Sequence, residues 1–186
     1  GLGTVLMPVF AIFFPLPVAI ASVAVVHLAN NLFKALLVGK YAKTNIVIKF
    51  GVPAALAAAL GAYLLSIFSN WPSLFSYHLY GSDFKVTIIG IIVGSMVMFS
   101  SIFELVPRFS RLSFDQGYIP LGGAISGFFG GVSGNQGILR SAFLIKSGLS
   151  KEEFIGTGVL CSVIVDVIRI LVYGWAVYTQ KFTETF

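Results

Sequence analysis

Apolar residues follow one another in several long runs along this chain, and short stretches rich in Gly, Pro, Lys and Arg separate them. A helix needs about 20 predominantly apolar residues to cross the hydrocarbon core of a bilayer. Four runs have this length and predict crossings over residues 18–39, 46–69, 84–106 and 153–178. The pattern therefore predicts an all-α fold of the polytopic membrane class.

Two further apolar runs, 4–14 and 138–145, are about half as long as a crossing. The first ends at Pro15-Leu16-Pro17. The second follows a small-residue-rich run, 117–131, and the stretch 130–137, which no continuous helix favours. In hydrocarbon, irregular backbone is tolerated only inside protein or beside a water-filled cavity. These runs therefore predict broken, re-entrant helices, with a binding site at the second break.

The composition supports a membrane domain and excludes several other classes. Of all residues 57% are hydrophobic and 10% are charged, and the mean hydropathy is +0.94. A soluble domain carries about 25% charged residues. We expect one transmembrane domain over 1–186. The basic residues that give the chain its net charge of +5 cluster in short loops between the apolar runs. Membrane orientation explains them there, so we predict no nucleic-acid partner.

The single Cys161 forms no intrachain disulfide, and no Cys/His spacing suits zinc, so no metal or cofactor is predicted.

The basic residues predict the orientation of the chain, because cytoplasmic loops are enriched in Lys and Arg. If the run 18–39 crosses inward, seven basic residues fall on the cytoplasmic side. They are Lys40, Lys43, Lys49, Arg108, Arg111, Lys146 and Lys151. The stretch 70–83, with Trp71, Tyr77, His78 and Tyr80, then lies outside at the membrane boundary. We expect a multi-pass protein of the cell inner (plasma) membrane.

A shift of 135 residues lays the polar positions of 18–39 on those of 153–178, and this indicates an internal repeat. The matched positions are Ser22 and Thr157, His27 and Ser162, Asn31 and Asp166, Lys34 and Arg169, Leu36 and Leu171, and Gly39 and Gly174. The two copies cross in opposite directions under the predicted topology. We expect inverted-topology repeats over about 1–69 and 117–186, joined by a helix over 84–106. Secondary transporters with a midplane site have this arrangement.

The stretches GLGTVLMP at the start of the chain and GGVSGNQGIL at 130–139 resemble the TauE/SafE sulfite-exporter family of membrane permeases. The resemblance implies transport of a small sulfur-containing anion such as sulfite, an organosulfonate or thiosulfate. Residues 137–141 depart from the family pattern, because many relatives have a proline there like Pro8. By analogy between the two copies, we expect a further helix before Gly1 and another after Phe186.

The candidate substrate-binding residues come from the second break and from the polar faces of the two repeat helices. They are Ser133, Gly134, Asn135, Gln136, Arg140, His27, Asn31, Lys34, Asp166 and Arg169. An ionisable side chain at a helix centre costs about 2.5–3.5 kcal/mol on insertion scales, so each needs a partner or a purpose. Arg140 either contacts the anion beside the free N–H groups of the break or extends to the cytoplasmic boundary.

Other polar residues also allow two interpretations. Asp166 and Arg169 either form a structural ion pair or act in transport, with Asp166 taking up a coupling proton and releasing Arg169 for the substrate. Lys34 either contacts substrate or extends to the boundary. The side chains of Ser133, Asn135 and Gln136 either bind the anion or cap the broken helix ends. His27, Asn30 and Asn31 either line a cavity or join helices. We expect Glu104 to pair with the arginines at 108 and 111.

Together these features favour a secondary transporter for a small anion that works by alternating access. A channel, or a transporter for another small solute or ion, is the alternative. A membrane enzyme has little support, because two histidines 51 positions apart and one cysteine form no catalytic constellation. A structural subunit would use its polar faces wholly in interhelical bonds. The expected partners are the anion and the lipid bilayer, and the sequence is compatible with a homodimer.

Overall fold

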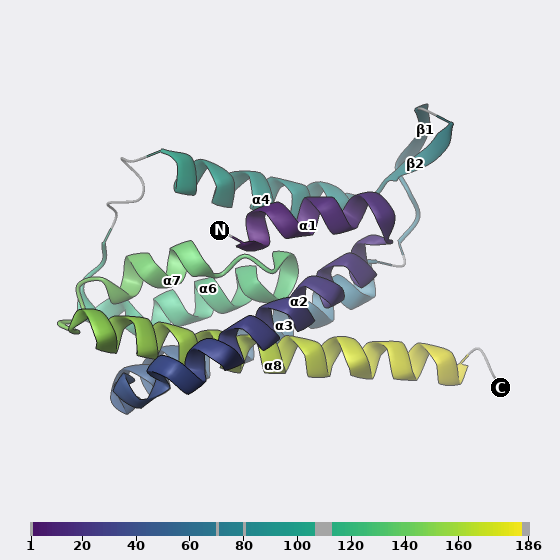
Figure 1. Ribbon diagram of the computed structural model, residues 1–186. Helices are drawn as coiled ribbons and strands as arrows, with labels where there is room; N and C mark the ends of the chain where they lie inside the picture. The colour runs from purple at the N-terminus through teal and green to yellow at the C-terminus, as the bar shows by residue number, and fades with distance from the viewer. Residues whose placement is uncertain (1, 70, 80, 107–112, 184–186) are drawn as a thin grey trace.

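The computed structural model describes residues 2–69, 71–79, 81–106 and 113–183, which form helices and one hairpin (Figure 1). Most of the chain is helical, in agreement with the all-α prediction. The elements are α1 (Leu2–Phe13), α2 (Leu16–Val38), η1 (Gly39–Tyr41), α3 (Thr44–Phe68), β1 (Phe75–Leu79), β2 (Ser82–Val86), α4 (Ile88–Leu105), η2 (Gln116–Tyr118), α6 (Ile119–Ser133), α7 (Gly137–Leu144) and α8 (Lys151–Thr183).

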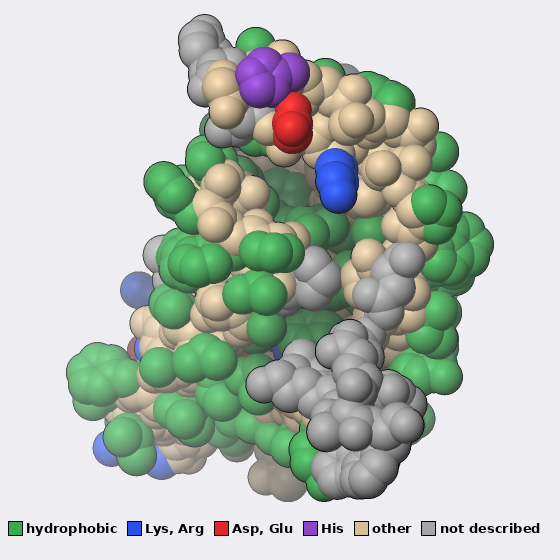
Figure 2. All heavy atoms as spheres, turned by 90° about the vertical axis from the view of Figure 1, so that its right-hand side faces the viewer, with side chains coloured by type: hydrophobic (Ala, Val, Ile, Leu, Met, Phe, Trp, Pro, Cys, Tyr) green, Lys and Arg blue, Asp and Glu red, His purple; other side chains and the backbone are tan. Residues whose placement is uncertain are grey.

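Four helices of the described chain are long and apolar enough to cross a membrane, and they belong to α2, α3, α4 and α8. Large apolar side chains are exposed on their outer faces, among them Leu36 at 85% and Leu56 at 70%. Figure 2 shows hydrophobic side chains over the flanks at the hairpin end of the molecule. Lipid is the solvent that such surfaces favour, so the fold is that of a multi-pass membrane protein.

The segment between α3 and α4 contains a β-hairpin, which the sequence did not predict. Strands β1 and β2 pair antiparallel, with Phe75 opposite Val86, and Gly81 makes the turn with φ of +79°. Helix α4 consequently starts at Ile88 rather than at Phe84. Its start is set by Thr87, whose hydroxyl accepts a hydrogen bond from the Gly90 N–H at 3.1 Å. Apolarity alone did not distinguish this exposed hairpin from the first turn of a crossing.

Helix α6 lies against α3 along a row of glycines. A Cβ atom on Gly123, Gly127 or Gly131 would lie only 2.2, 2.1 or 2.3 Å from a carbonyl oxygen of α3. These oxygens belong to Phe50, Ala54 and Ala58, which are also four residues apart. Small residues at this spacing let two helix backbones approach closely in a membrane. The contact fixes the position of α6 along the axis of α3.

Helix α8 begins with a capping box at Ser150 and Glu153. The Ser150 hydroxyl accepts a hydrogen bond from the Glu153 N–H at 3.3 Å, and the Glu153 carboxylate accepts one from the Ser150 N–H at 3.0 Å. From this start, α8 runs beside α2 in the opposite chain direction (Figure 1). The end of α2 and the start of α8 therefore lie at the same end of the molecule, together with the lysines near both.

Candidate functional site

The second break lies between α6 and α7, and it covers residues 134–136. Gly134 caps α6 in the left-handed conformation with φ of +79°, which a side chain would strain, and its N–H donates to Gly130 O at 3.1 Å. Helices α6 and α7 have 15 and 8 residues, too few to cross separately. Figure 1 shows α7 folding back beside α6. The predicted re-entrant arm is present, but helix α6 continues through Gly130 and Gly131 to Ser133.

Serine hydroxyls hold the two ends of this break. The Ser133 hydroxyl donates to Phe129 O at 2.9 Å and accepts from the Asn135 N–H at 3.4 Å. The Ser126 hydroxyl donates to Gln136 O at 2.9 Å. The capping interpretation of Ser133 therefore agrees with its contacts, because its side chain bonds the helix end.

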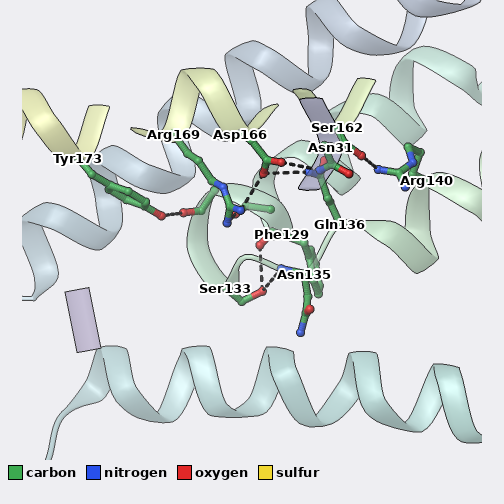
Figure 3. A network of polar contacts seen from close by, with 12 residues as sticks. Asn31, Phe129, Ser133, Asn135, Gln136, Arg140, Ser162, Asp166, Arg169 and Tyr173 are labelled. Atoms are coloured by element: carbon green, nitrogen blue, oxygen red, sulfur yellow. Dashed lines mark hydrogen bonds and ion pairs between the residues drawn. The ribbon is translucent and has the colours of Figure 1, made fainter. Parts of the chain in front are cut away.

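Two buried side chains of α8, Arg169 and Tyr173, fix this helix to the last turn of α6, and Arg169 also forms an ion pair within α8. Arg169 Nη2 lies 2.7 Å from Asp166 Oδ1, and both side chains have 0% exposure. Arg169 Nη1 also donates to Gly130 O at 3.3 Å, and the Tyr173 hydroxyl donates to Gly131 O. Figure 3 shows these side chains reaching from α8 toward the end of α6. The two opposite charges thus lie in contact at a fully buried point.

Asp166 also binds a residue of α2. Asn31 Nδ2 donates to Asp166 Oδ2 at 2.7 Å, and Gln136 Nε2 lies 3.4 Å from Asp166 Oδ1. The bond to Asn31 joins two residues 135 positions apart, the shift that aligns the two halves of the sequence. The carboxylate thus connects α2, α8 and the break at a single buried point (Figure 3).

A cavity of about 160 Å³ lies beside this point. It is lined mainly by α2, the break and α7, with one residue each from α1, α4 and α8. Its lining residues are Thr4, His27, Asn30, Asn31, Lys34, Glu104, Gly134, Asn135, Gln136, Gly137, Arg140 and Ser162. The polar face of α2 and the second break therefore meet at one hollow.

The family model for the sulfite exporter TauE/SafE matches residues 1–183 of the chain. The chain belongs to the TauE/SafE family. No curated protein and no solved structure matches it. The family is one of membrane transporters of the sulfite-exporter type, in agreement with the four long apolar helices. The described part of the chain has no group of three His, Cys, Asp or Glu residues that could hold a metal ion.

Seven of the ten predicted site residues line the cavity of this TauE/SafE chain. They are His27, Asn31, Lys34, Gly134, Asn135, Gln136 and Arg140. Asp166 and Arg169 lie behind the wall. Asp166 contacts Asn31 and Gln136, and Arg169 contacts Asp166, whereas Ser133 bonds to the helix end. The structure thus brings together residues that are more than 100 positions apart in the sequence.

Five lining residues were not among the predicted site residues: Thr4, Asn30, Glu104, Gly137 and Ser162. A signal existed for Ser162, because the repeat matches it to His27. Thr4 and Glu104 join the site through packing of α1 and α4, which no local pattern encodes. The Thr4 hydroxyl donates to Glu104 Oε2 at 3.0 Å. The arginines expected beside Glu104 lie outside the described residues.

Two cations face the cavity of the TauE/SafE chain without a carboxylate in salt-bridge range among the described residues. Lys34 comes from the last turns of α2 and Arg140 from the first turn of α7. Arg140 Nη1 donates to the Ser162 hydroxyl, which orients the guanidinium along the wall (Figure 3). Arg140 thus lines the cavity and bonds to α8.

Several buried polar atoms of this region have no hydrogen-bond partner among the described residues: His27 Nε2, Asn135 Nδ2, Gln136 Oε1 and Arg169 Nε. The first three belong to residues that line the cavity. An unpaired buried polar atom costs about 1–3 kcal/mol, so proteins rarely leave several together unless a ligand or water completes them. The cavity therefore has the character of a binding site for a polar solute.

Proposed function

We propose that this chain is a secondary transporter, a permease for a small sulfur-containing anion such as sulfite, an organosulfonate or thiosulfate. The observation that carries the proposal is the cavity itself. It brings Lys34 of α2 and Arg140 of α7 to the break at which α7 begins. The solute would bind there, and alternating access would expose the cavity first to one side of the membrane and then to the other.

The chemistry of the walls favours an oxyanion. Lys34 and Arg140 supply two positive charges, against one carboxylate from Glu104. The first N–H groups of a helix have no acceptor within the helix, and together with a guanidinium they favour negatively charged oxygens. Gly137 places the start of α7 at the cavity wall. This polarity supports an anion over a cation or a neutral solute.

The size of the cavity supports a small solute. Its volume of about 160 Å³ has room for several water molecules. Sulfite or a short organosulfonate fits in such a space, whereas a large organic anion would need the helices to separate.

Alternating access in our proposal rests on inverted repeats over about 1–69 and 117–186, joined by the helix at 84–106. Two observations support this arrangement. Helices α2 and α8 run in opposite directions (Figure 1), and Asn31 bonds to Asp166, its own counterpart under the 135-residue shift. Equivalent residues of two copies contact each other where a two-fold axis passes between them. We therefore place this pseudo-axis at the Asn31–Asp166 contact.

The two copies differ in the exposure of a matched cation, and this supports a one-sided opening. Lys34 is exposed and lines the cavity, whereas its counterpart Arg169 has 0% exposure and bonds to Asp166 and Gly130. An alternating transporter holds its two halves in different conformations in each state. With the lysine-rich end cytoplasmic in the plasma membrane, as the positive-inside rule predicts, we propose that the cavity opens inward here.

The decisive experiment measures sulfite and thiosulfate flux in proteoliposomes with Arg140→Gln. Loss of a charge-assisted hydrogen bond costs about 1.5–3 kcal/mol, so we expect kcat/KM to fall about 10- to 100-fold. Lys146→Gln is the matched control, because Lys146 is exposed and lies 3.5 Å from Asp115 away from the cavity. Unchanged anion flux in Arg140→Gln would refute the proposed site.

A second measurement separates a carrier from a channel. A carrier exchanges labelled anion faster when unlabelled anion is present on the opposite side, because the loaded site returns more readily than the empty one. A channel shows no such acceleration. We expect acceleration by sulfite on the trans side, and its absence would favour the channel alternative.

A further inference from the structure

The Asp166 carboxylate is fully buried and accepts hydrogen bonds from three elements. Asn31 Nδ2 of α2 lies 2.7 Å from Oδ2, Arg169 Nη2 of α8 lies 2.7 Å from Oδ1, and Gln136 Nε2 of the break lies 3.4 Å from Oδ1. Its exposed fraction is 0%. Figure 3 shows these donors converging on the carboxylate. A single negative charge therefore orients three donor side chains.

Two of these donors, Asn31 and Gln136, belong to residues that also line the cavity. Each carboxamide has its NH2 group on one side and its oxygen on the other, and the reversed orientation would place an oxygen against the carboxylate. Because the Asp166 carboxylate accepts hydrogen bonds from both NH2 groups, the two amide oxygens point away from it. Gln136 Oε1 is buried and has no donor among the described residues. While Asp166 is ionised, the NH2 groups of Asn31 and Gln136 point to its carboxylate and are not available to an anion in the cavity.

We propose that Asp166 is a positioning residue that links proton uptake to anion binding, an inference that rests on the transport function proposed above. A proton from solution converts the carboxylate into an acid whose O–H can donate to Gln136 Oε1. The amide of Gln136 is then free to reverse and to offer its NH2 group to the cavity, while Asn31 keeps its hydrogen bond to Asp166 Oδ2. Arg169 also loses the charge that holds it. The protonated site therefore binds the anion more tightly.

Through the surrounding charges, anion binding also favours protonation of Asp166. Arg169 of α8, His27 and Lys34 of α2 and Arg140 of α7 face the Asp166 region, and Glu104 of α4 lies on the cavity wall. Helices α1 and α6 carry no charged residue, and Lys49 is the only one in α3. The cations Arg169, Lys34 and Arg140 lie in this region when no anion is bound. A bound anion offsets those cations, so anion binding favours protonation by the factor with which protonation favours binding.

The closing experiment on the wild-type chain measures proton uptake directly. Thiosulfate serves as the probe, because it does not titrate between about pH 6 and pH 8. Isothermal titration in two buffers with different protonation enthalpies gives the number of protons taken up per anion bound. We expect uptake of up to one proton per anion bound. The uptake should be largest at a pH at which Asp166 is ionised in the empty protein and protonated in the anion complex. Binding with no proton uptake across this pH range would overturn the coupling and leave the proposed function intact.

Proteoliposomes then test the residue with Asp166→Asn. The wild type should accumulate thiosulfate at least tenfold when a proton gradient is imposed, and Asp166→Asn should lose this accumulation and the pH dependence of its exchange. Asp115→Asn, which removes an exposed carboxylate, is the matched control and should behave as wild type. Retained proton-driven accumulation in Asp166→Asn would refute the role of Asp166. If the wild type neither binds nor exchanges thiosulfate and sulfite, the proposed function fails instead.

Discussion

The packing of α6 on α3 gives a prediction whose size can be worked out from the structure. In Gly127→Ala the new Cβ atom would lie 2.1 Å from the Ala54 carbonyl oxygen. Ordinary contact begins at 3.4 Å, so the two backbones must separate by roughly 1 Å. Neither partner can rotate away, because the obstructing atom belongs to a helix backbone. Overpacking of this kind costs about 1–3 kcal/mol of the free energy of unfolding.

The assay is reversible unfolding in mixed detergent micelles, followed by circular dichroism. Gly94→Ala is the matched control, because a Cβ atom at Gly94 of α4 would have no neighbour within 4 Å. This control should lose no stability and should gain up to about 1 kcal/mol from helix propensity. We also expect Gly127→Ala to weaken anion binding, because α6 carries the break that lines the cavity. Equal stability of the two variants would refute the close approach of α6 and α3.

Three further changes test separate parts of the account. Lys34→Gln should raise the KM for sulfite about 10-fold through loss of a cavity cation, whereas Lys85→Gln in the exposed hairpin should leave KM unchanged. Flux assays would refute the site if both variants matched wild type. Tyr173→Phe should cost about 0.5–1.5 kcal/mol of unfolding free energy, because Gly131 O loses a buried donor; an unchanged stability would count against this bond. Ser150→Ala should cost about 1 kcal/mol by removing the cap of α8, and an unfolding midpoint equal to wild type would contradict that cap.

The sequence predicted the crossings because apolarity over about 20 residues is a local property of the chain. It also predicted the re-entrant arm, although the break begins at Gly134 rather than at Gly130. Glycine disfavours a helix in isolation, but at Gly131 the close approach of α3 decides the conformation. The hairpin at 75–86 was missed because its aromatic residues suit a membrane boundary as well as a strand.

The candidate site was predictable only where the repeat supplied long-range information. The 135-residue shift matched Asn31 with Asp166, and these two residues are in contact. Nothing local distinguished Asp166, which lies behind the wall, from Asn31, which lines the cavity. The places of Thr4 and Glu104 depend on how α1 and α4 pack beside the break, and this information is spread over many apolar contacts.

The most direct test of the central claim is an experimental structure of the chain with a bound selenium oxyanion, such as selenite, located by its anomalous scattering. Our account predicts one peak in the cavity, within hydrogen-bonding distance of the Arg140 guanidinium and of the break at 134–137. A saturating anion that leaves this cavity empty, or a continuous helix through 130–140, would contradict it.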